Sequence, residues 1–555
     1  MPSWKKKIGQ LLVEMGALTR DGAERAADHA LRTGRRFGEA VVELGLATAE
    51  EVNQAAAAQR AEEIQLLDLD RVRIDPVWAM KVPASLAIRR NVLPFAVADR
   101  LLYVACADPG DHAALEAVER HTAMKVYAQR AEPESLRRAL QRVYPDPTAR
   151  ASGHPAAPGK GAVPEADDDA VALSEELLRS ALLRQASDIH LEPARDGLRV
   201  RFRVDGVLEE FRKVPAAKQG GLVSRFKVLG GMDIAEKRAP QDGGFSWKFG
   251  PAGRQRAVDI RLATLPTKYG ERMTLRLLSL HTDNLTLERL GMAPRDLEVF
   301  SSALSRPHGI LLLTGPTGSG KTTTLYAAIR QLDRETLNIM TIEDPIEYEI
   351  AGVSQVEVDS ADKVTFSKAL RSVLRHDPDV LMIGEIRDLD TADVAIKASL
   401  TGHLVFSTLH TNSAASTITR LIDMGVPAYL VAATLRLAVA QRLVRRLCPS
   451  CRRPRELTAP EAVALGRPEA VGRTVHDPAG CAYCGGQGYS GRVGLFEMMS
   501  ADDEIVAMIG RRAPEAELSA AAKAKGMRTL HDDAAEKVLA GVTSLTEAME
   551  VVEPG

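Results

Sequence analysis

A long uninterrupted apolar segment is missing from this sequence of 555 residues. The longest apolar stretch, Ala428 to Ala440, contains Arg436 and falls short of the ~20 residues that a membrane-spanning helix needs. Three lysines at positions 5–7 resemble the positive flank of a signal peptide, but Glu14 and Arg20 interrupt the apolar stretch that would have to follow. We therefore expect a soluble, cytoplasmic protein whose contact with a membrane is peripheral.

The sequence also lacks an excess of either charge, because 72 Lys and Arg residues stand against 74 Asp and Glu residues. Proteins that bind polyanions nonspecifically carry a strong basic excess, so we expect no nucleic-acid partner. Cysteine is scarce as well, and five in 555 residues are too few for a secreted protein built on disulfides. At roughly 150 residues a domain, the length predicts about three or four domains.

Pattern and composition divide the chain into segments. Residues 7–16 recur as residues 36–45, and in each copy a short helix, a glycine and a capping threonine (Thr19, Thr48) precede a second helix. Such a repeat is typical of stacked helical units. The predicted segments are a helical repeat module (1–62), a small α/β domain (63–145), a flexible linker rich in Pro, Gly and Ala (146–170), a second α/β domain (171–285), a domain of alternating strands and helices (286–500) and a helical C-terminal region (501–555).

A phosphate-binding loop is the strongest motif in the chain. An apolar strand runs into Gly315-Pro316-Thr317-Gly318-Ser319-Gly320-Lys321-Thr322, which matches G-x-x-x-x-G-K-[ST], and Thr323 opens a helix. In this motif the glycines let backbone N–H groups surround the phosphates, and the helix N-terminus favours negative charge. Lys321 is expected to reach the β- and γ-phosphates, and the Thr322 hydroxyl to ligate Mg²⁺. The sequence therefore predicts that a nucleoside triphosphate binds at residues 315–323.

Acidic residues follow two further apolar strands, one ending at Glu343-Asp344-Pro345 and the other at Gly384-Glu385. Ligands bind at the carboxyl ends of parallel strands, and a triphosphatase needs carboxylates there to hold magnesium and orient water. A carboxylate after a strand can also be a helix cap, but two of them together with a phosphate loop favour catalysis. A third strand is flanked by His403 and His410, and His410 lies where a γ-phosphate sensor is expected.

These motifs, in this order, resemble those of the type II/IV secretion and pilus-assembly ATPases. The family has the phosphate loop, an "Asp box" that matches Glu343, a Walker B motif that matches Glu385, and a "His box" that matches His403 and His410. The resemblance continues at residues 186–193, 233–238 and 241–243, and so covers nearly the whole chain.

The resemblance implies a particular architecture and role. We expect an α/β protein with a RecA-like P-loop ATPase core, a preceding PAS-like α/β domain, a zinc-knuckle insertion, and N-terminal helical and small α/β modules. Family members are homo-hexamers on the cytoplasmic face of the inner membrane. They use ATP hydrolysis to move an inner-membrane platform protein, with a cytoplasmic adaptor, and so extrude a pilus or pseudopilus.

Roles for individual residues follow from the same resemblance. Glu343 is expected to polarise the attacking water, with Glu385 supporting magnesium and water, although the sequence leaves the division between these carboxylates open. Arg261 and Arg276 resemble arginines that reach the nucleotide of a neighbouring subunit, and Arg272 is a further candidate. Arginine suits this role because it offers a fixed fork of donors, while a surface ion pair is the alternative interpretation.

Four of the five cysteines form two C-x-x-C pairs, Cys448 with Cys451 and Cys481 with Cys484, separated by 29 residues. Four thiolates in this pattern are typical of a tetrahedral, structural zinc site, and we expect a zinc subdomain at residues 448–484. A redox disulfide and an iron–sulfur cluster are the alternatives. Retraction motors of the superfamily generally lack this insertion, so the resemblance favours an assembly motor.

The N-terminal repeat resembles a domain that binds cyclic di-GMP in some of these ATPases. The second copy keeps the expected arginine and glutamine, Arg36 and Gln59, whereas the first copy has Lys7 and Ala30 instead. Arginine can stack on a purine and bind phosphate with two donors, whereas lysine supplies only charge. Two hypotheses follow, namely cyclic di-GMP binding and docking on the platform protein or another partner.

The leading hypothesis is an ATP-driven motor for type IV pilus or type II secretion assembly, and the sequence does not separate these two machines. The alternative is a conjugation-type NTPase that translocates nucleic acid, which the near-neutral charge disfavours. A third hypothesis is a scaffold that binds nucleotide without hydrolysis. The intact Lys321, Glu343 and Glu385 count against it.

Overall fold

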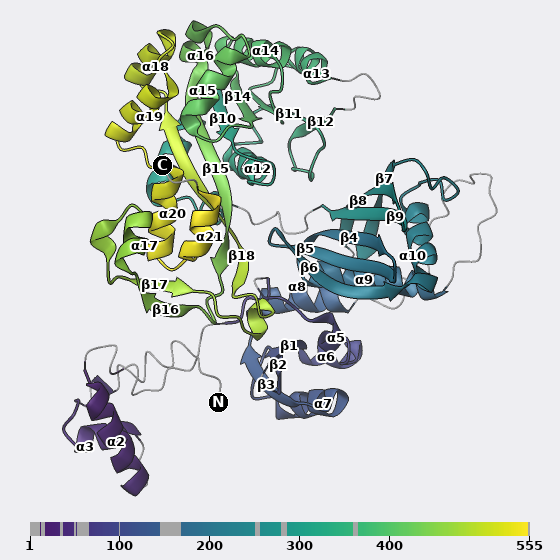
Figure 1. The fold of residues 1–555 in the computed structure, drawn as a ribbon, viewed down its shortest axis with the longest axis vertical. Helices are drawn as coiled ribbons and strands as arrows, with labels where there is room; N and C mark the ends of the chain where they lie inside the picture. Colours follow the sequence, from purple (N-terminus) through teal and green to yellow (C-terminus); the bar gives the residue numbers. More distant parts are fainter. Residues whose placement is uncertain are drawn as a thin grey trace.

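The structure is a computed structural model, in which several packed bodies are joined by connecting segments (Figure 1). Within the described residues no helix is long and apolar enough to cross a membrane. Most of the predicted linker, up to residue 167, falls outside the described residues. The structure describes residues 12, 17–33, 37–48, 51–52, 66–70, 72–98, 100–144, 168–249, 256–278, 286–358 and 365–552.

The N-terminal repeat contains the predicted helices, α2 (Arg20–Thr33) and α3 (Phe37–Glu43). Both capping threonines are in place. The Oγ1 atoms of Thr19 and Thr48 each accept a hydrogen bond from the backbone N–H three residues later, over 3.1 and 3.2 Å. The residues that the cyclic di-GMP hypothesis needs, Lys7, Arg36 and Gln59, lie outside the described residues.

A three-stranded sheet forms the centre of the next body. Strand β1 (Val92–Ala98) is antiparallel to β2 (Leu101–Cys106), and β3 (Lys125–Arg130) pairs with β2 in parallel. The β1 and β2 side chains are mostly buried, and they share one hydrophobic cluster with residues of the flanking helices. These helices are α5 (Pro76–Ala79), α6 (Ala84–Arg90), α7 (His112–Thr122) and α8 (Pro133–Val143). The mixed strand and helix content predicted for this segment is present.

An antiparallel sheet of six strands follows, in the order β6-β5-β4-β9-β8-β7. Apolar and charged residues alternate along β5, so they lie on opposite faces of the sheet. The apolar side chains of Val200, Phe202 and Val204 are buried, and the arginines between them are more exposed. The buried face shares its hydrophobic cluster with helices α9 (Asp168–Leu183) and α10 (Ala216–Leu229). The strands are β4 (Ala186–Ala194), β5 (Gly197–Val204), β6 (Val207–Pro215), β7 (Gln241–Phe249), β8 (Arg256–Thr267) and β9 (Gly270–Leu277).

A seven-stranded sheet, β12-β11-β13-β14-β10-β15-β18, carries the predicted nucleotide motifs. All of its pairs are parallel except that of β15 with β18. Every side chain of β10, β13 and β14 is buried, as expected for parallel strands covered on both faces. The strands are β10 (Gly309–Thr314), β11 (Ile339–Glu343), β12 (Ser354–Glu357), β13 (Val380–Ile383), β14 (Leu404–Leu409), β15 (Leu435–Leu447) and β18 (Tyr489–Ser500). The helices between them are α12 (Lys321–Gln331), α13 (Phe366–Val373), α14 (Leu389–Leu400), α15 (Ala414–Asp423) and α16 (Ala428–Thr434), and α11 (Pro294–Leu304) precedes them.

Strands β15 and β18 are long, and their far ends extend away from the sheet toward β1–β3 (Figure 1). The insertion between them contains β16 (Arg453–Glu456), α17 (Ala459–Ala464), β17 (Thr474–Asp477) and the short turns η2 (Pro468–Ala470) and η3 (Ala482–Cys484). The C-terminal helices share a hydrophobic cluster with the seven-stranded sheet, so this region is packed on that sheet. These helices are α18 (Asp503–Gly510), α19 (Glu515–Ala524), α20 (Leu530–Leu539) and α21 (Leu545–Val551).

Candidate functional site

The phosphate loop connects β10 to α12. Three glycines of the loop have positive φ angles, +147° at Gly315, +80° at Gly318 and +88° at Gly320. Residues with a side chain rarely adopt such angles. A Cβ atom on Gly315 would lie 2.4 Å from the carbonyl oxygen of Gln441 on β15, so the close approach of that strand requires glycine. Gly320 is the N-cap of α12, and the helix begins at Lys321. The backbone path that the motif predicts is therefore formed.

Lys321 folds back over this loop. Its Nζ donates to the carbonyl oxygens of Gly315 and Pro316, over 2.7 and 3.1 Å, and the residue is 8% exposed. Burial lowers the pKa of Lys321 to about 8, while the nearby Glu385 opposes this shift and Arg442 adds to it. A phosphate group beside the amine would favour the charged ammonium form, because opposite charges stabilise each other.

A buried hydroxyl in the loop also fits a bound phosphate. Ser319 is 4% exposed, and in the described structure its Oγ has no hydrogen-bond partner. A buried hydroxyl without a partner is costly, and a phosphate oxygen held by the loop would accept its hydrogen bond. Thr322 and Thr323, which follow at the first turn of α12, are partly exposed. The donor set therefore fits the phosphates of ATP, with the Thr322 hydroxyl available to Mg²⁺.

Glu385 and His410 lie at the same edge of the sheet, after β13 and β14. Glu385 Oε2 is 3.4 Å from His410 Nε2, and the side chains are 15% and 49% exposed. The loop that bears His410 is tied to the phosphate strand, because the Thr411 N–H donates to Thr314 Oγ1 over 2.7 Å. The structure thus brings together the predicted Walker B carboxylate, the predicted sensor histidine and Lys321.

His403 occupies a different environment, at the start of β14. Its Nδ1 lies 2.8 Å from the carbonyl oxygen of Ala398, near the end of α14. This contact links the helix end to the strand, which is a structural role. Of the two histidines that flank β14, His410 is therefore the one placed beside Glu385.

The other predicted catalytic carboxylate, Glu343, is 2% exposed at the end of β11. Its Oε1 accepts hydrogen bonds from Thr341 Oγ1 over 2.7 Å and from Gln355 Nε2 over 3.1 Å. Its Oε2 accepts a hydrogen bond from the Tyr326 hydroxyl. Both oxygens of Glu343 thus have protein donors. Glu385 pairs with Arg387 through Oε1 and lies beside His410 through Oε2. The role of Glu343 in polarising water stays a prediction.

Two of the candidate arginines pair with acidic residues of their own sheet. Arg276 Nε on β9 donates to Asp188 Oδ1 over 3.0 Å, and Arg272 lies 2.8 Å from Glu192. The Arg276 side chain is nevertheless 67% exposed. The ion pair therefore leaves much of this guanidinium open to solvent.

Arg261, on β8, faces the seven-stranded sheet of the same chain. It lies 3.8 Å from Glu357 of β12, and its side chain is 40% exposed. Burial raises the pKa of Glu347, which follows the Asp box, and Arg261 and Arg276 oppose that shift. Both arginines therefore lie close enough to the Asp box to act on Glu347, and the six-stranded sheet lies beside β12 in Figure 1. Their reach to a neighbouring subunit stays a prediction.

The four paired cysteines converge at the far ends of β15 and β18. Their Sγ atoms all lie within 4.8 Å of one another, and the separations of Cys448 from Cys481 and of Cys451 from Cys484 are 3.8 and 3.9 Å. Zn–S bonds of about 2.3 Å in a tetrahedron place the sulfurs about 3.8 Å apart, whereas a disulfide needs about 2.05 Å. All four are free thiols, so their arrangement fits a four-coordinate zinc ion.

Backbone groups also favour a thiolate at this site. The neighbouring thiols of Cys448 and Cys481 lower the pKa of Cys484, and hydrogen bonds from the N–H groups of Cys481 and Gly488 act in the same direction. These two N–H groups donate to Cys484 Sγ over 3.2 and 3.1 Å. The contacts with Cys448 and Cys484 raise the pKa of Cys481, so the site favours the thiolate first at Cys484. Metal ligation requires the thiolate form.

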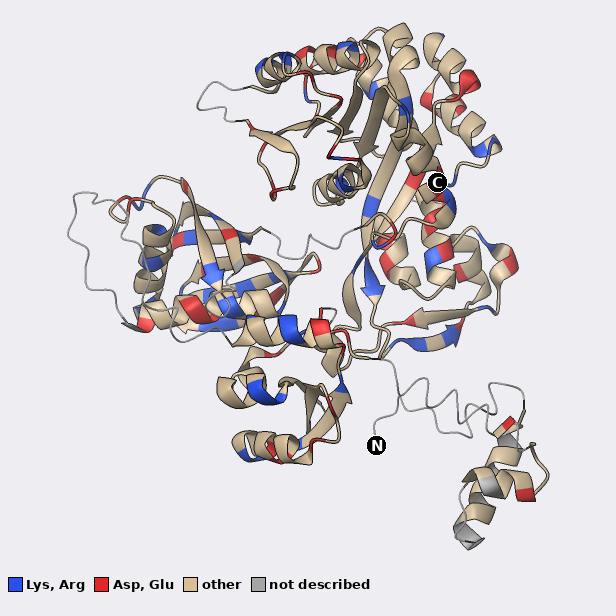
Figure 2. Cartoon of the chain, turned by 180° about the vertical axis from the view of Figure 1, so that it is seen from behind, with Lys and Arg blue, Asp and Glu red and all other residues tan. Residues whose placement is uncertain are grey.

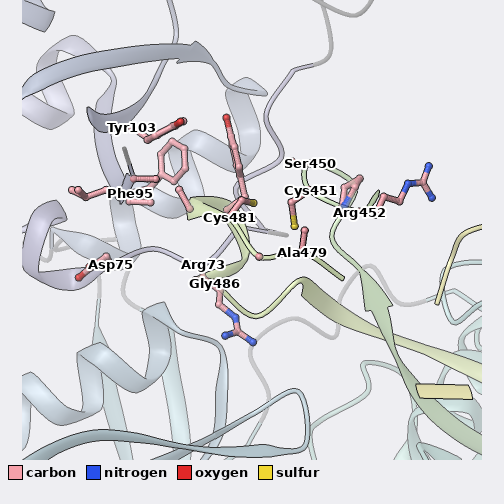
Figure 3. Close-up of a pocket in the computed structure, with 18 of the residues that line it drawn as sticks. Arg73, Asp75, Phe95, Tyr103, Ser450, Cys451, Arg452, Ala479, Cys481 and Gly486 are labelled. Atoms are coloured by element: carbon pink, nitrogen blue, oxygen red, sulfur yellow. The ribbon is translucent and has the colours of Figure 1, made fainter. Parts of the chain in front are cut away.

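The metal-ligating turn packs on the three-stranded sheet. Tyr483, between two of the cysteines, has its ring centroid 5.5 Å from that of Phe95 and 5.7 Å from that of Tyr103. A cleft of about 1040 Å³ opens beside this contact. Figure 3 shows Phe95 and Tyr103 on one side of the cleft, and Cys451 and Arg452 on the other. The lining of this cleft contains no residue of the phosphate loop, so the cleft is separate from the nucleotide site.

Two residues around the phosphate loop are not predicted from the sequence. Gln441 Oε1, on β15, accepts a hydrogen bond from Thr324 Oγ1 over 2.9 Å. Arg442 Nη2 donates to the backbone carbonyl oxygen of Asn412, over 3.3 Å, and lies near Lys321. Both residues belong to no motif. Their contacts with the site depend on the strand order, so no local pattern in the sequence indicates them.

Comparisons with known proteins agree with this geometry. The family described as "Type II/IV secretion system protein" matches residues 165–550, and the family described as "MshEN domain" matches residues 63–150. The chain is 48% identical to "Type II secretion system protein E" of Pseudomonas aeruginosa over 389 residues, which cover 70% of this chain and 76% of that protein. It is 37% identical to the "Type IV pilus assembly ATPase PilB" of Myxococcus xanthus over 566 residues, which cover 99% of both.

A solved structure supports the fold. The ATPase DotB of Legionella pneumophila superposes with a TM-score of 0.51 at 21% identity, covering 68% of this chain and 94% of that chain. The family match itself includes the phosphate loop, Glu385, His410 and the four paired cysteines. The protein belongs to the type II/IV secretion system protein family and is an ATP hydrolase.

Proposed function

We propose that this chain is the hexameric cytoplasmic ATPase that powers assembly of a type IV pilus or a type II secretion pseudopilus. The seven-stranded sheet is the RecA-like core that hydrolyses ATP, and the six-stranded sheet is the PAS-like domain that offers arginines to a neighbouring subunit. The hexamer binds peripherally at the inner membrane, where it acts on the platform protein and a cytoplasmic adaptor. ATP with Mg²⁺ at residues 315–323 and Zn²⁺ at the four cysteines are its cofactors.

One observation carries this proposal, namely the convergence of Lys321, Glu385 and His410 at one edge of a parallel sheet. Lys321 begins α12 after β10, while Glu385 and His410 follow β13 and β14. The Coulomb interaction of Glu385 with Lys321 and the 3.4 Å contact of Glu385 with His410 connect the three groups. Together they surround the place where the γ-phosphate of a nucleotide in the loop would lie.

Each group has a distinct task in hydrolysis. The loop N–H groups and Lys321 bind the phosphates, and the ammonium stabilises the charge that develops as the terminal phosphoryl group transfers. Glu343, supported by Glu385, holds the attacking water and takes its proton. His410, beside Glu385, responds to the presence of the γ-phosphate. The Thr322 hydroxyl would hold magnesium, which would supply positive charge to offset that of the phosphates.

The extent of the sequence similarity favours the pilus machine over the secretion machine. The pilus assembly ATPase aligns with 99% of this chain, including the N-terminal bodies, whereas the type II secretion relative aligns with 70%. The test is a gene deletion complemented with the wild-type chain or with Lys321→Ala. We expect only the wild type to restore surface pili, with secreted enzymes unchanged. Loss of secretion with normal pili would assign the chain to the other machine.

The nucleic-acid translocase is the alternative to be tested. Figure 2 shows basic and acidic residues interspersed along the backbone of both large sheet bodies, as the near-neutral composition predicts. ATP hydrolysis by the full chain is measured with DNA and with the cytoplasmic domain of the platform protein. We expect stimulation by the platform domain alone. Stimulation by DNA without any by the platform domain would overturn the motor proposal.

The N-terminal repeat of residues 1–62 is the proposed regulatory module. Its resemblance to a cyclic di-GMP-binding domain is the support for a nucleotide ligand, although Lys7 and Ala30 depart from that pattern. Titration of the full chain with cyclic di-GMP distinguishes this role from docking. Saturable heat at micromolar ligand supports sensing, whereas no heat together with retention of the adaptor protein supports docking.

A further inference from the structure

A buried tyrosine links the phosphate loop to the Asp box. Tyr326 lies on α12, five residues after Lys321, and is 0% exposed. Its hydroxyl donates a hydrogen bond to Oε2 of Glu343 and accepts a hydrogen bond from the backbone N–H of Glu347 over 3.4 Å. The Tyr326 ring packs edge-on against Tyr348, with centroids 4.5 Å apart and planes at 83°. One side chain of the phosphate-binding helix thus contacts both the carboxylate and the turn that follows it.

The hydrogen bonds on Glu343 come from three different elements. Thr341 is on the same strand, Gln355 is on β12, and Tyr326 is on α12. The terminal torsion of a glutamate is broad, so a single donor would leave the carboxylate free to rotate. Three donors from three directions fix its plane. Tyr326 is the donor that belongs to the helix carrying Lys321.

We propose that the Tyr326 hydroxyl is a positioning group for the Glu343 carboxylate, which couples the phosphate loop to the Asp box during ATP hydrolysis. The proposal rests on the proposed catalytic role of Glu343. Five residues of α-helix make about 1.4 turns, so Lys321 and Tyr326 belong to one short rigid segment. A displacement of α12 on phosphate binding therefore acts directly on Glu343.

The surroundings of Tyr326 keep its hydroxyl protonated. Burial raises the pKa of Tyr326, and Glu343 raises it further, so the phenol remains a donor at neutral pH. Glu347 of the following turn also lies near Glu343, and Arg261 and Arg276 of the six-stranded sheet lie near Glu347.

The substitution Tyr326→Phe removes the hydroxyl and keeps the ring that packs on Tyr348. We expect kcat to fall about 10- to 100-fold, because the lost bond is to a charged group, with the KM for ATP within about threefold. A fall in kcat without a change in KM separates positioning of the carboxylate from nucleotide binding. Thr341→Val, which removes a second donor to Glu343, should lower kcat in the same way and leave the KM unchanged.

Tyr489→Phe is the matched control, since it removes a buried tyrosine hydroxyl that bonds Ser544 over 2.7 Å. It should leave kcat and the KM unchanged. A Tyr326→Phe enzyme with wild-type kcat would overturn the proposal, as would loss of ADP binding, which indicates a structural role. Glu343→Gln distinguishes failure of the positioning role of Tyr326 from failure of the catalytic role of Glu343. If it abolishes turnover while Tyr326→Phe does not change it, only the positioning role fails. If Glu343→Gln hydrolyses ATP normally, the catalytic role of Glu343 fails as well.

Discussion

At the scale of single residues, Lys321 couples nucleotide binding to protonation. Burial lowers its pKa to about 8, so in the free protein the amine is charged below that pH and neutral above it. ATP favours the ammonium, so binding above pH 8 takes up a proton. We expect the Kd for ATP to rise about tenfold per pH unit above about 8. Calorimetry in buffers of different ionisation enthalpy measures the uptake, and an affinity that stays constant from pH 7 to pH 9.5 would contradict it.

A second residue-scale prediction concerns Glu385, whose side chain is 15% exposed beside His410. Glu385→Gln keeps the shape of the side chain but removes its charge. We expect kcat to fall about 100-fold or more, with ATP still bound, because the proposed mechanism uses this charge to orient magnesium and water in the transition state. Single-turnover hydrolysis and ATP binding provide the measurement. Glu504→Gln, an exposed partner of Lys525, is the control and should hydrolyse at the wild-type rate.

The sequence predicts a residue of this site only where that residue belongs to a short local motif. The phosphate loop, Glu385 and His410 are recognisable because each follows an apolar strand within a short motif. Gln441 and Gln355 contact the same site from strands β15 and β12, and nothing in their local sequence indicates those contacts. Such contacts depend on the strand order, which places distant segments side by side.

At the scale of elements, apolar runs predict the strands β10, β13 and β14 because parallel strands are buried on both faces. The same rule fails for β15, where Arg436, Gln441 and Arg442 interrupt the apolar run and the strand continues into the cysteine-bearing turn. This strand changes environment along its length. Its first part pairs with β10 in the sheet, and its last part pairs only with β18.

The cysteine site gives a prediction at this scale. The four thiols join the ends of β15 and β18 to the intervening insertion, so a bound metal restrains all of them. We expect one zinc per chain in the purified protein and none in Cys481→Ser, with faster hydrogen exchange in residues 448–484. Cys106→Ala is the control, because this buried cysteine belongs to the three-stranded sheet and should leave the zinc content at one per chain. Zinc retained in Cys481→Ser would refute the four-cysteine site.

At the scale of the whole molecule, three bodies meet at the metal-ligating turn. The backbone N–H of Arg73 donates to the Tyr483 carbonyl oxygen over 3.2 Å. The Arg73 guanidinium bonds Glu209 and Asp205 of the six-stranded sheet, over 3.0 and 3.3 Å. Asp205 Oδ2 also accepts the N–H of Gly491 on β18 over 3.1 Å. No single segment of the sequence predicts this junction, because its contacts join residues that lie more than 100 positions apart.

Tyr483 is the largest apolar contact at this junction, and its replacement tests whether the metal site holds the three-stranded sheet in place. The ring is 6% exposed against Phe95 and Tyr103, so Tyr483→Ala should weaken the contact by about 3 kcal/mol. We expect faster hydrogen exchange in strands β1 and β2 with zinc still bound, and the same increase in wild-type protein after zinc is chelated. Tyr429→Ala, which removes a 67% exposed ring on α16, should change neither. If exchange in β1 and β2 stays slow in Tyr483→Ala, the sheet is held by other contacts such as the Arg73 ion pairs.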